Sequence, residues 1–289
     1  MVNSSATLPR WLKKAVPKHR NIQDVRTLLS DLPFESVCES AKCPNIGECW
    51  SEKVLTFMLL GNTCTRACTF CAIDTGRGGP PDPDEPRRVA EATERLGLAH
   101  VVVTSVARDD LKDQGAGQFV KTIEAIRSRT PGVTIEVLIP DFKGHPDLLQ
   151  MVVAARPDVL NHNVETVPRL SPKIRPQAKY ERSLELLSRV KTMDPSIYTK
   201  SGIMIGLGET DDEVKQTLSD LRNIRCDMVT IGQYLAPSTH HERVVEYVAP
   251  EKFEEYRRFG DALGFIEIFS GPFVRSSYRA SVPKGRLPL

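Results

Sequence analysis

The chain has 289 residues, of which 40% are hydrophobic and 26% are charged, an ordinary composition for a globular protein of one large or two smaller domains. The formal net charge of +2 is too balanced to indicate nucleic-acid binding, and no apolar run approaches the ~18 residues of a membrane span. The opening stretch is basic but lacks the apolar segment of a secretory signal, so we expect a cytoplasmic protein without a nucleic-acid or membrane partner.

The first 53 residues show no clear strand and contain three cysteines in the stretch "CESAKCPNIGECW". These cysteines are Cys38, Cys43 and Cys49. Because no regular strand and helix pattern surrounds them, we expect residues 1–53 to form an N-terminal extension that packs on the following domain and does not fold independently.

From residue 54 onward, short β-rich runs alternate with amphipathic helical stretches. The predicted strands are 54–60, 100–106, 133–139, 158–164, 199–207 and 227–235. The predicted helices are 86–98, 115–129, 145–155, 180–193, 210–224 and 250–263. Six successive strand–helix units with apolar strands predict an α/β fold with a parallel sheet. We favour a partial, open (β/α)6 barrel of the TIM type over residues 54–269, and a doubly wound sheet is the alternative.

Polar residues follow the end of every predicted strand, where barrels of this kind build their active sites. They are Cys64–Cys71, Arg108 with Asp109 and Asp110, Asp141, Asn163 with Glu165, Gly208 with Glu209, and Gln233 with Tyr234. Asp110 and Asp141 are also typical of helix caps. The tail, residues 270–289, is rich in Ser, Pro and basic residues, and we expect it to cross an open face of the barrel.

Three further cysteines occupy the stretch "CTRACTFC" just after the first predicted strand: Cys64, Cys68 and Cys71. Structural zinc sites prefer cysteine pairs closed to four ligands, and fully protein-ligated iron–sulfur clusters also use four cysteines. Three thiolates would leave one iron of a four-iron cluster open to a substrate or cofactor. In a reducing compartment, such clustering indicates metal chemistry more than disulfides.

The C-x3-C-x2-C spacing, with the aromatic Phe70 before the last cysteine, resembles the signature of radical S-adenosylmethionine (SAM) enzymes. The upstream C-x4-C-x5-C pattern and "RSSY" near the C-terminus are similar to the lipoyl synthase family within that superfamily. The same resemblance extends to "LPRWLKK", "TSVARDDL", "NHNVETV", "GIMIGLGET" and "TIGQYLAPS".

This resemblance implies two [4Fe–4S] clusters. The catalytic cluster, whose open iron would chelate SAM, would be held by Cys64, Cys68 and Cys71. The auxiliary cluster would be held by Cys38, Cys43 and Cys49. The resemblance implies Ser277 as the fourth ligand of the auxiliary cluster, with Ser276 as the alternative.

The resemblance also implies the reaction and its partners. Reductive cleavage of SAM gives a 5′-deoxyadenosyl radical, and sulfur from the auxiliary cluster is inserted at C6 and C8 of an octanoyl chain. The substrate would be an octanoyl-lysine on a lipoyl carrier domain, either of a 2-oxoacid dehydrogenase E2 subunit or of the glycine cleavage H protein. A ferredoxin or flavodoxin would donate electrons, and an iron–sulfur carrier protein would rebuild the auxiliary cluster.

Binding of SAM also needs polar contacts. Asn163 and Glu165 stand two apart on the fourth predicted strand, so they face one way and fit the ribose hydroxyls. Arg108 could pair with the SAM carboxylate, although an arginine at a strand end more often forms a surface ion pair. In "GIMIGLGET", we expect Gly206 and Gly208 to let the backbone approach the cofactor.

Two other interpretations stay open at this point: another radical SAM sulfur-inserting enzyme, and a zinc or iron–sulfur binding module without catalytic activity. The seventh cysteine, Cys226, opens the sixth predicted strand in an apolar setting and is expected to be a buried structural thiol. His240 and His241 fit either a surface loop or the edge of a substrate site.

Overall fold

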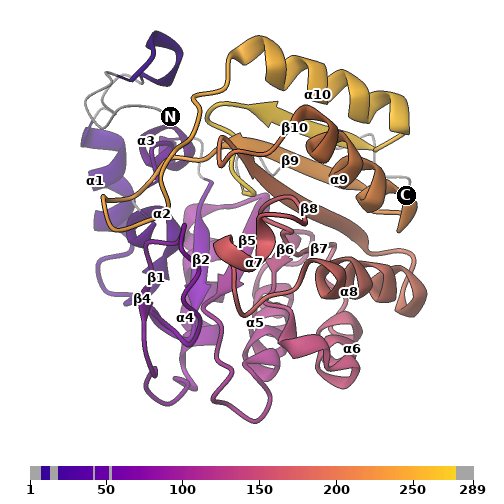
Figure 1. Cartoon of the computed structure of the whole chain (residues 1–289). Coiled ribbons are helices and arrows are strands. Elements are labelled where there is room, and N and C mark those ends of the chain that lie inside the picture. The colour runs from indigo at the N-terminus through magenta and orange to yellow at the C-terminus, as the bar shows by residue number, and fades with distance from the viewer. Residues whose placement is uncertain (1–7, 14–18, 42, 52–53, 278–289) are drawn as a thin grey trace. The chain divides into compact units, whose positions relative to one another are not determined.

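The computed structural model describes residues 8–13, 19–41, 43–51 and 54–277, and most of the predicted tail therefore lies outside the described residues. The chain divides into two compact units. Unit 1 consists of Met1–Ala15, Ala67–Ala72 and His162–Ser276. Unit 2 consists of Val16–Arg66, Ile73–Asn161 and Ser277–Leu289. Figure 1 labels the helices and strands of both units.

The strands of unit 2 are mostly parallel. They are β1 (Glu35–Ser36), β2 (Thr56–Leu59), β5 (His100–Ser105), β6 (Thr134–Leu138) and β7 (Val159–Asn161), in the spatial order β1-β2-β5-β6-β7. Only β1 pairs antiparallel with its neighbour among these described strands. A separate parallel pair, β3 (Thr63–Cys64) and β4 (Asp74–Thr75), frames the start of the second cysteine loop. The three valines of β5 are at most 1% exposed, as expected for a strand covered on both faces.

Helices follow these strands in sequence order, and Figure 1 shows α4, α5 and α6 as successive neighbours. The helices of unit 2 are α1 (His19–Leu28), α2 (Val37–Ser40), α3 (Ile46–Ser51), α4 (Glu85–Leu96), α5 (Ala116–Arg129), the 3₁₀ turn η2 (Phe142–Gly144) and α6 (Pro146–Ala154). Phe119, Ile123 and Ile126 recur at helical spacing on α5 and are at most 1% exposed. This apolar stripe packs α5 into the core of the unit.

Unit 1 contains three parallel strands, β8 (Tyr198–Ile205), β9 (Met228–Gln233) and β10 (Glu267–Gly271), in that spatial order. Its helices are η1 (Arg10–Leu12), α7 (Ser171–Ile174), α8 (Tyr180–Met193), α9 (Asp211–Asn223) and α10 (Pro250–Leu263). Leu207, Tyr234 and Ile174 form a small apolar cluster at the ends of β8 and β9. No helix among the described residues is long and apolar enough to cross a membrane.

The predicted fold class is confirmed: the chain is an α/β protein of mainly parallel strands followed by helices, the pattern of a partial (β/α)6 barrel. All six predicted strands and all six predicted helices are present. Four strands were missed, because β1, β3 and β4 have only two residues each and β10 is a short run that ends in Ser-Gly. The fourth strand is shorter than predicted, since β7 ends at Asn161.

Thr210 and Glu213 form the predicted capping box at the start of α9, in which each side chain accepts a hydrogen bond from the other's backbone N–H. Thr210→Ala should lower the free energy of unfolding by about 1 kcal/mol, because an N–H of the first turn loses its acceptor. Ser219→Ala on the same helix is the control and should be neutral or slightly stabilising, since alanine is the better helix former. Urea unfolding followed by circular dichroism compares them, and equal midpoints would contradict the cap assignment.

Candidate active site

The first cysteine triplet lies in unit 2 on two short helices. Cys38 in α2 and Cys49 in α3 are each 9% exposed, and Cys43 in the connecting turn is half-buried. The N–H of Cys43 donates to the Cys38 carbonyl at 3.0 Å, and the Ile46 N–H donates to the Cys43 carbonyl at 3.3 Å. The backbone thus folds the three cysteines into one compact segment. None of the seven cysteines in the chain forms a disulfide.

The boundary between the units falls between Ser276 and Ser277. Ser277 groups with unit 2, which also holds the first cysteine triplet, whereas Ser276 groups with unit 1. Both serines are half-buried. The assignment of Ser277 as the ligand, with Ser276 as the alternative, stays a prediction.

The second cysteine loop begins in unit 2 with Cys64 at the end of β3. The Gly76 N–H donates to the Cys64 carbonyl at 2.8 Å, which ties Cys64 to the residue that follows β4. The Arg66 N–H approaches the Cys64 sulfur at 3.4 Å. An N–H group that points at a thiolate sulfur is one of the ways in which proteins tune an iron–sulfur cluster.

Arg66, within the same loop, forms a buried ion network that the sequence analysis missed. Its guanidinium makes two hydrogen bonds of 2.9 Å to Asp109 and one of 2.6 Å to Asp141. The side chain of Arg66 is 6% exposed and that of Asp141 is fully buried. The two carboxylates raise the pKa of Arg66 against the opposing effect of burial. Since Asp109 and Asp141 follow β5 and β6, the network fastens the loop to two strand ends.

Arg108, a predicted SAM contact, is 2% exposed and pairs with Asp110 through Nε at 2.9 Å and Nη2 at 3.1 Å. Nη2 also donates to the Gly78 carbonyl at 3.4 Å. This pairing holds the pKa of Asp110 below its usual range. The Nη1 atom of Arg108 has no hydrogen-bond partner among the described residues. Asp141 caps η2 as predicted, because its carboxylate accepts from the Lys143 N–H at 3.0 Å.

The other end of the loop, Ala67–Ala72, belongs to unit 1. The Cys71 N–H donates to the Cys68 carbonyl at 3.1 Å, which closes a tight turn. Thr69 bridges two segments, because its N–H donates to the Ile174 carbonyl and its carbonyl accepts from the Glu242 N–H, both at 2.9 Å. Phe70 packs against the apolar cluster of Ile174, Leu207 and Tyr234.

His241 also supports this turn. Its Nε2 donates to the Cys71 carbonyl at 3.0 Å, and its Nδ1 then accepts from the Ser238 hydroxyl at 2.8 Å. This arrangement requires the tautomer with hydrogen on Nε2, because a carbonyl can only accept. The sequence singled out His241 but gave no reason to connect it with a residue 170 positions away.

Asn163 and Glu165 lie just beyond β7, so the prediction that they share a strand is wrong. Glu165 has a left-handed backbone with φ of 65° and forms an isolated bridge with Ile203. The two residues nevertheless lie near each other, since Asn163 influences the Glu165 carboxylate. Burial raises the pKa of Glu165, and nearby Arg175 and Asn163 oppose that shift. The buried Oδ1 of Asn163 has no hydrogen-bond partner among the described residues.

Arg175 holds the backbone of this pair, and the sequence analysis did not predict it as a site residue. It is 2% exposed, and its Nη1 donates to the Asn163 carbonyl at 2.9 Å. Its Nη2 donates to the Ser183 hydroxyl at 2.7 Å, and Ser183 also contacts Nε2 of His162 at 2.9 Å. Arg175 therefore holds the backbone that carries the unpartnered Asn163 oxygen.

Gly206 and Gly208 of "GIMIGLGET" allow the backbone of the loop after β8 to adopt its conformation. Gly206 has φ of +100°, and a Cβ there would lie 2.2 Å from Nε2 of Gln233 and 2.5 Å from the Glu246 carbonyl. Gly208 has φ of +101°, and its carbonyl accepts from Arg169 at 2.8 Å. Glu209 accepts from the N–H groups of Gly206 and Leu207, and burial raises its pKa. A role for Gly206 and Gly208 in binding SAM stays a prediction.

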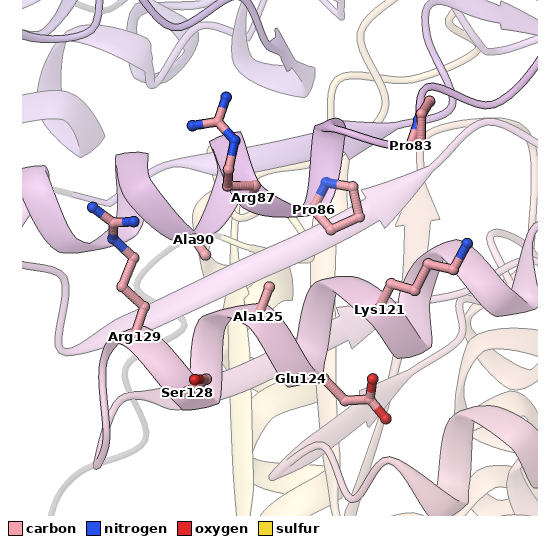
Figure 2. Close-up of a pocket in the computed structure, with 9 residues that line it drawn as sticks. All are labelled: Pro83, Pro86, Arg87, Ala90, Lys121, Glu124, Ala125, Ser128 and Arg129. Atoms are coloured by element: carbon pink, nitrogen blue, oxygen red, sulfur yellow. The ribbon is translucent and has the colours of Figure 1, made fainter.

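A surface groove lies elsewhere, between α4 and α5 of unit 2 (Figure 2). It is lined by Pro83, Pro86, Ala90, Ala125, Lys121 and Arg129, among others. None of the predicted site residues lines it. Arg87 at this groove pairs with Asp84 at 2.7 Å, and Arg129 pairs with Glu94 at 2.6 Å, so these two charges are already balanced.

The donor chemistry of the cysteine triplets fits iron–sulfur clusters, because each supplies three cysteine sulfurs that are not in disulfides. No three His, Cys, Asp or Glu side chains within the described part of the chain converge on the position of a single metal ion. A four-iron cluster is wider than one ion, so its thiolates stand further apart. Cys226 is fully buried, as predicted, and burial raises the pKa of its thiol to about 12.

Comparison with known proteins adds independent evidence. The family model described as the radical SAM superfamily matches residues 58–221. The chain is 56% identical to a lipoyl synthase from Caldanaerobacter subterraneus subsp. tengcongensis, over 95% of this chain and 96% of that protein. It is 52% identical to a lipoyl synthase from Rubrobacter xylanophilus, over 94% of this chain and 85% of that protein.

Solved structures share the fold at low identity. Methylornithine synthase (PylB) is similar with a TM-score of 0.52 and 15% identity, over 91% of this chain and 87% of that one. Streptococcus suis SuiB bound to its precursor peptide SuiA gives a TM-score of 0.58 and 7% identity, over 92% of this chain and 57% of that one. At such identities the similarity concerns the fold alone.

Arg66→Ala should destabilise the protein by about 3–5 kcal/mol, because it leaves Asp109 and Asp141 without the guanidinium that bridges them. Arg87→Ala is the matched control, since its ion pairs are exposed to solvent and should contribute little. Anaerobic urea unfolding of both variants provides the measurement. Equal effects of the two substitutions would show that the buried network does not hold the loop.

Proposed function

We propose that this chain, which belongs to the lipoyl synthase family of the radical SAM superfamily, inserts sulfur at C6 and C8 of an octanoyl chain on a lysine of a lipoyl carrier domain. The observation that carries the proposal is 52–56% identity to curated lipoyl synthases over 94–96% of the chain. Two triplets of cysteines that form no disulfide supply the donor set that this chemistry needs.

Cys64, Cys68 and Cys71 would hold the catalytic [4Fe–4S] cluster. When bound, this cluster and SAM supply a carbon radical that abstracts hydrogen from an unactivated carbon. The chain positions the loop from both ends: Arg66 and Gly76 fix Cys64, and His241 fixes the Cys71 carbonyl. A loop held in this way costs little to order when the cluster and cofactor bind.

Unit 1 offers matching contacts for SAM. The Asn163 Oδ1 is a buried acceptor without a partner among the described residues, and a ribose hydroxyl would supply the missing donor. Glu165 beside it is a second acceptor, and Phe70 closes the turn with an apolar surface. In unit 2, Arg108 would use Nη1 for the SAM carboxylate, because Nε and Nη2 are engaged by Asp110 and Gly78.

The auxiliary [4Fe–4S] cluster would be held by Cys38, Cys43, Cys49 and Ser277 and would act as the sulfur donor. A serine alkoxide is a harder and far more basic ligand than a thiolate, so protonation releases it readily from iron. That property suits a cluster that must be dismantled during the reaction. Regeneration would require an iron–sulfur carrier protein, and a ferredoxin or flavodoxin would supply the electrons.

The two triplets should separate in function. The anaerobically reconstituted protein should hold about eight irons, and replacement of Cys64, Cys68 and Cys71 by Ala should leave about half. Replacement of Cys38, Cys43 and Cys49 by Ala should preserve SAM cleavage but eliminate sulfur insertion. Iron and sulfide analysis, with product assays on an octanoylated carrier peptide, provides the measurement. Lipoyl product from the second variant would exclude the auxiliary cluster as sulfur donor.

Ser277→Ala should abolish or strongly reduce lipoyl formation while SAM cleavage survives, because only the auxiliary cluster loses a ligand. Ser277→Cys should keep the cluster but make product poorly, since a thiolate is softer and less easily protonated. Ser276→Ala is the matched control and should be much milder. Product yield beside the Mössbauer spectrum tests all three variants, and near-normal product from Ser277→Ala would refute the ligand assignment.

A further inference from the structure

The C-terminal segment crosses strand β9 at a point where no side chain fits. Gly232 of β9 lies opposite Gly271 of β10 in the parallel register. A Cβ built on Gly232 would lie 2.2 Å from the carbonyl oxygen of Val274 and 3.2 Å from its carbonyl carbon. Real Cβ atoms essentially never approach other atoms within 3.0 Å, so any side chain here would push the backbone of Val274 outward by at least 0.8 Å (3.0 minus 2.2).

Further contacts hold Val274 at the point where the C-terminal segment crosses β9. The Val274 N–H donates to the Gly271 carbonyl at 3.0 Å, which closes the turn after β10. The Val274 side chain is 9% exposed, and the Arg275 guanidinium donates to the Val274 carbonyl at 2.7 Å. The obstructing atoms belong to the backbone of this fixed turn and not to the flexible end of a side chain. The segment therefore cannot yield by a simple rotamer change.

We propose that Gly232 is the positioning residue that seats the C-terminal segment and thereby sets where Ser277, three residues beyond Val274, can reach. The inference rests on the proposed function, in which Ser277 is a ligand of the auxiliary cluster. In this proposal Gly232 binds neither the cluster nor the substrate. It acts by having no side chain, which lets the segment lie directly on the strand.

Glycine otherwise has a cost at this position, because glycine inside a strand weakens it relative to residues with side chains. A Gly232→Ala change should therefore help the strand locally and harm only the crossing. A displacement of about 1 Å in a ligand-bearing segment can lower activity by about 100-fold. The expected defect is thus large and confined to the auxiliary cluster.

Gly271→Ala is a matched control within the same pair of strands. Its Cβ would lie 3.5 Å from a methyl group of Val274, which is an ordinary van der Waals contact. Both substitutions add one methyl group beside Val274 at paired register positions. Only the Gly232 substitution meets the backbone.

The test uses anaerobically reconstituted holoenzyme of both variants. Hydrogen exchange of a peptide covering residues 271–277 reports the position of the segment, and the rate of iron loss to a chelator reports the auxiliary cluster. In Gly232→Ala we expect faster exchange, loss of about half the iron at least ten times faster than in wild type, and retained SAM cleavage. Gly271→Ala should match the wild type in all three measurements.

Exchange or iron loss in Gly232→Ala equal to that in Gly271→Ala would overturn the inference. Failure of the proposed function has a different signature, because wild-type enzyme would then make no lipoyl product from an octanoylated carrier peptide. Failure of the Ser277 assignment is distinct again, since Ser277→Ala would form product normally. Each of the three results is read from a different sample.

Discussion

A four-iron cluster needs four ligands, and each cysteine triplet of this chain supplies three. The proposed fourth ligand differs between the two triplets. In the proposed function the vacancy at the catalytic triplet is kept for SAM, so the protein would have to hold Cys64, Cys68 and Cys71 in place without a fourth protein bond. At the auxiliary triplet the proposed ligand is Ser277, which comes from the far end of the chain.

The support for the second cysteine loop is polar and buried. Arg66 is held by two carboxylates, and His241 donates to the Cys71 carbonyl. Such contacts add little net stability compared with an apolar core, because charges must be removed from water. Their value is directional, since a guanidinium between two fixed carboxylates permits few positions of the loop. The protein thus accepts a modest gain in stability for a defined geometry of its sulfur ligands.

The sequence predicted the regular elements well because their signals are local. Valine runs such as 101–103 and helix starts such as Thr210 with Glu213 are visible within a few residues. The cysteine spacing is also local, and it carried the family resemblance. The contacts that fix the site are not local: Arg66 reaches 75 residues along the chain to Asp141, and His241 reaches 170 residues to Cys71. No window on the sequence shows such pairs.

The end of the fourth strand shows how a prediction from strand geometry can fail while the two residues concerned still lie near each other. Asn163 and Glu165 were expected to face one way because alternate residues of a strand do so. The strand ends at Asn161, and a left-handed backbone at Glu165 turns the chain instead. Arg175 donates to the Asn163 carbonyl and lies near the Glu165 carboxylate. The pair is therefore placed by a turn with a left-handed residue, held by a buried arginine. Because the turn buries the Asn163 Oδ1 without a partner among the described residues, this oxygen is the atom on which the proposed contact with a ribose hydroxyl depends.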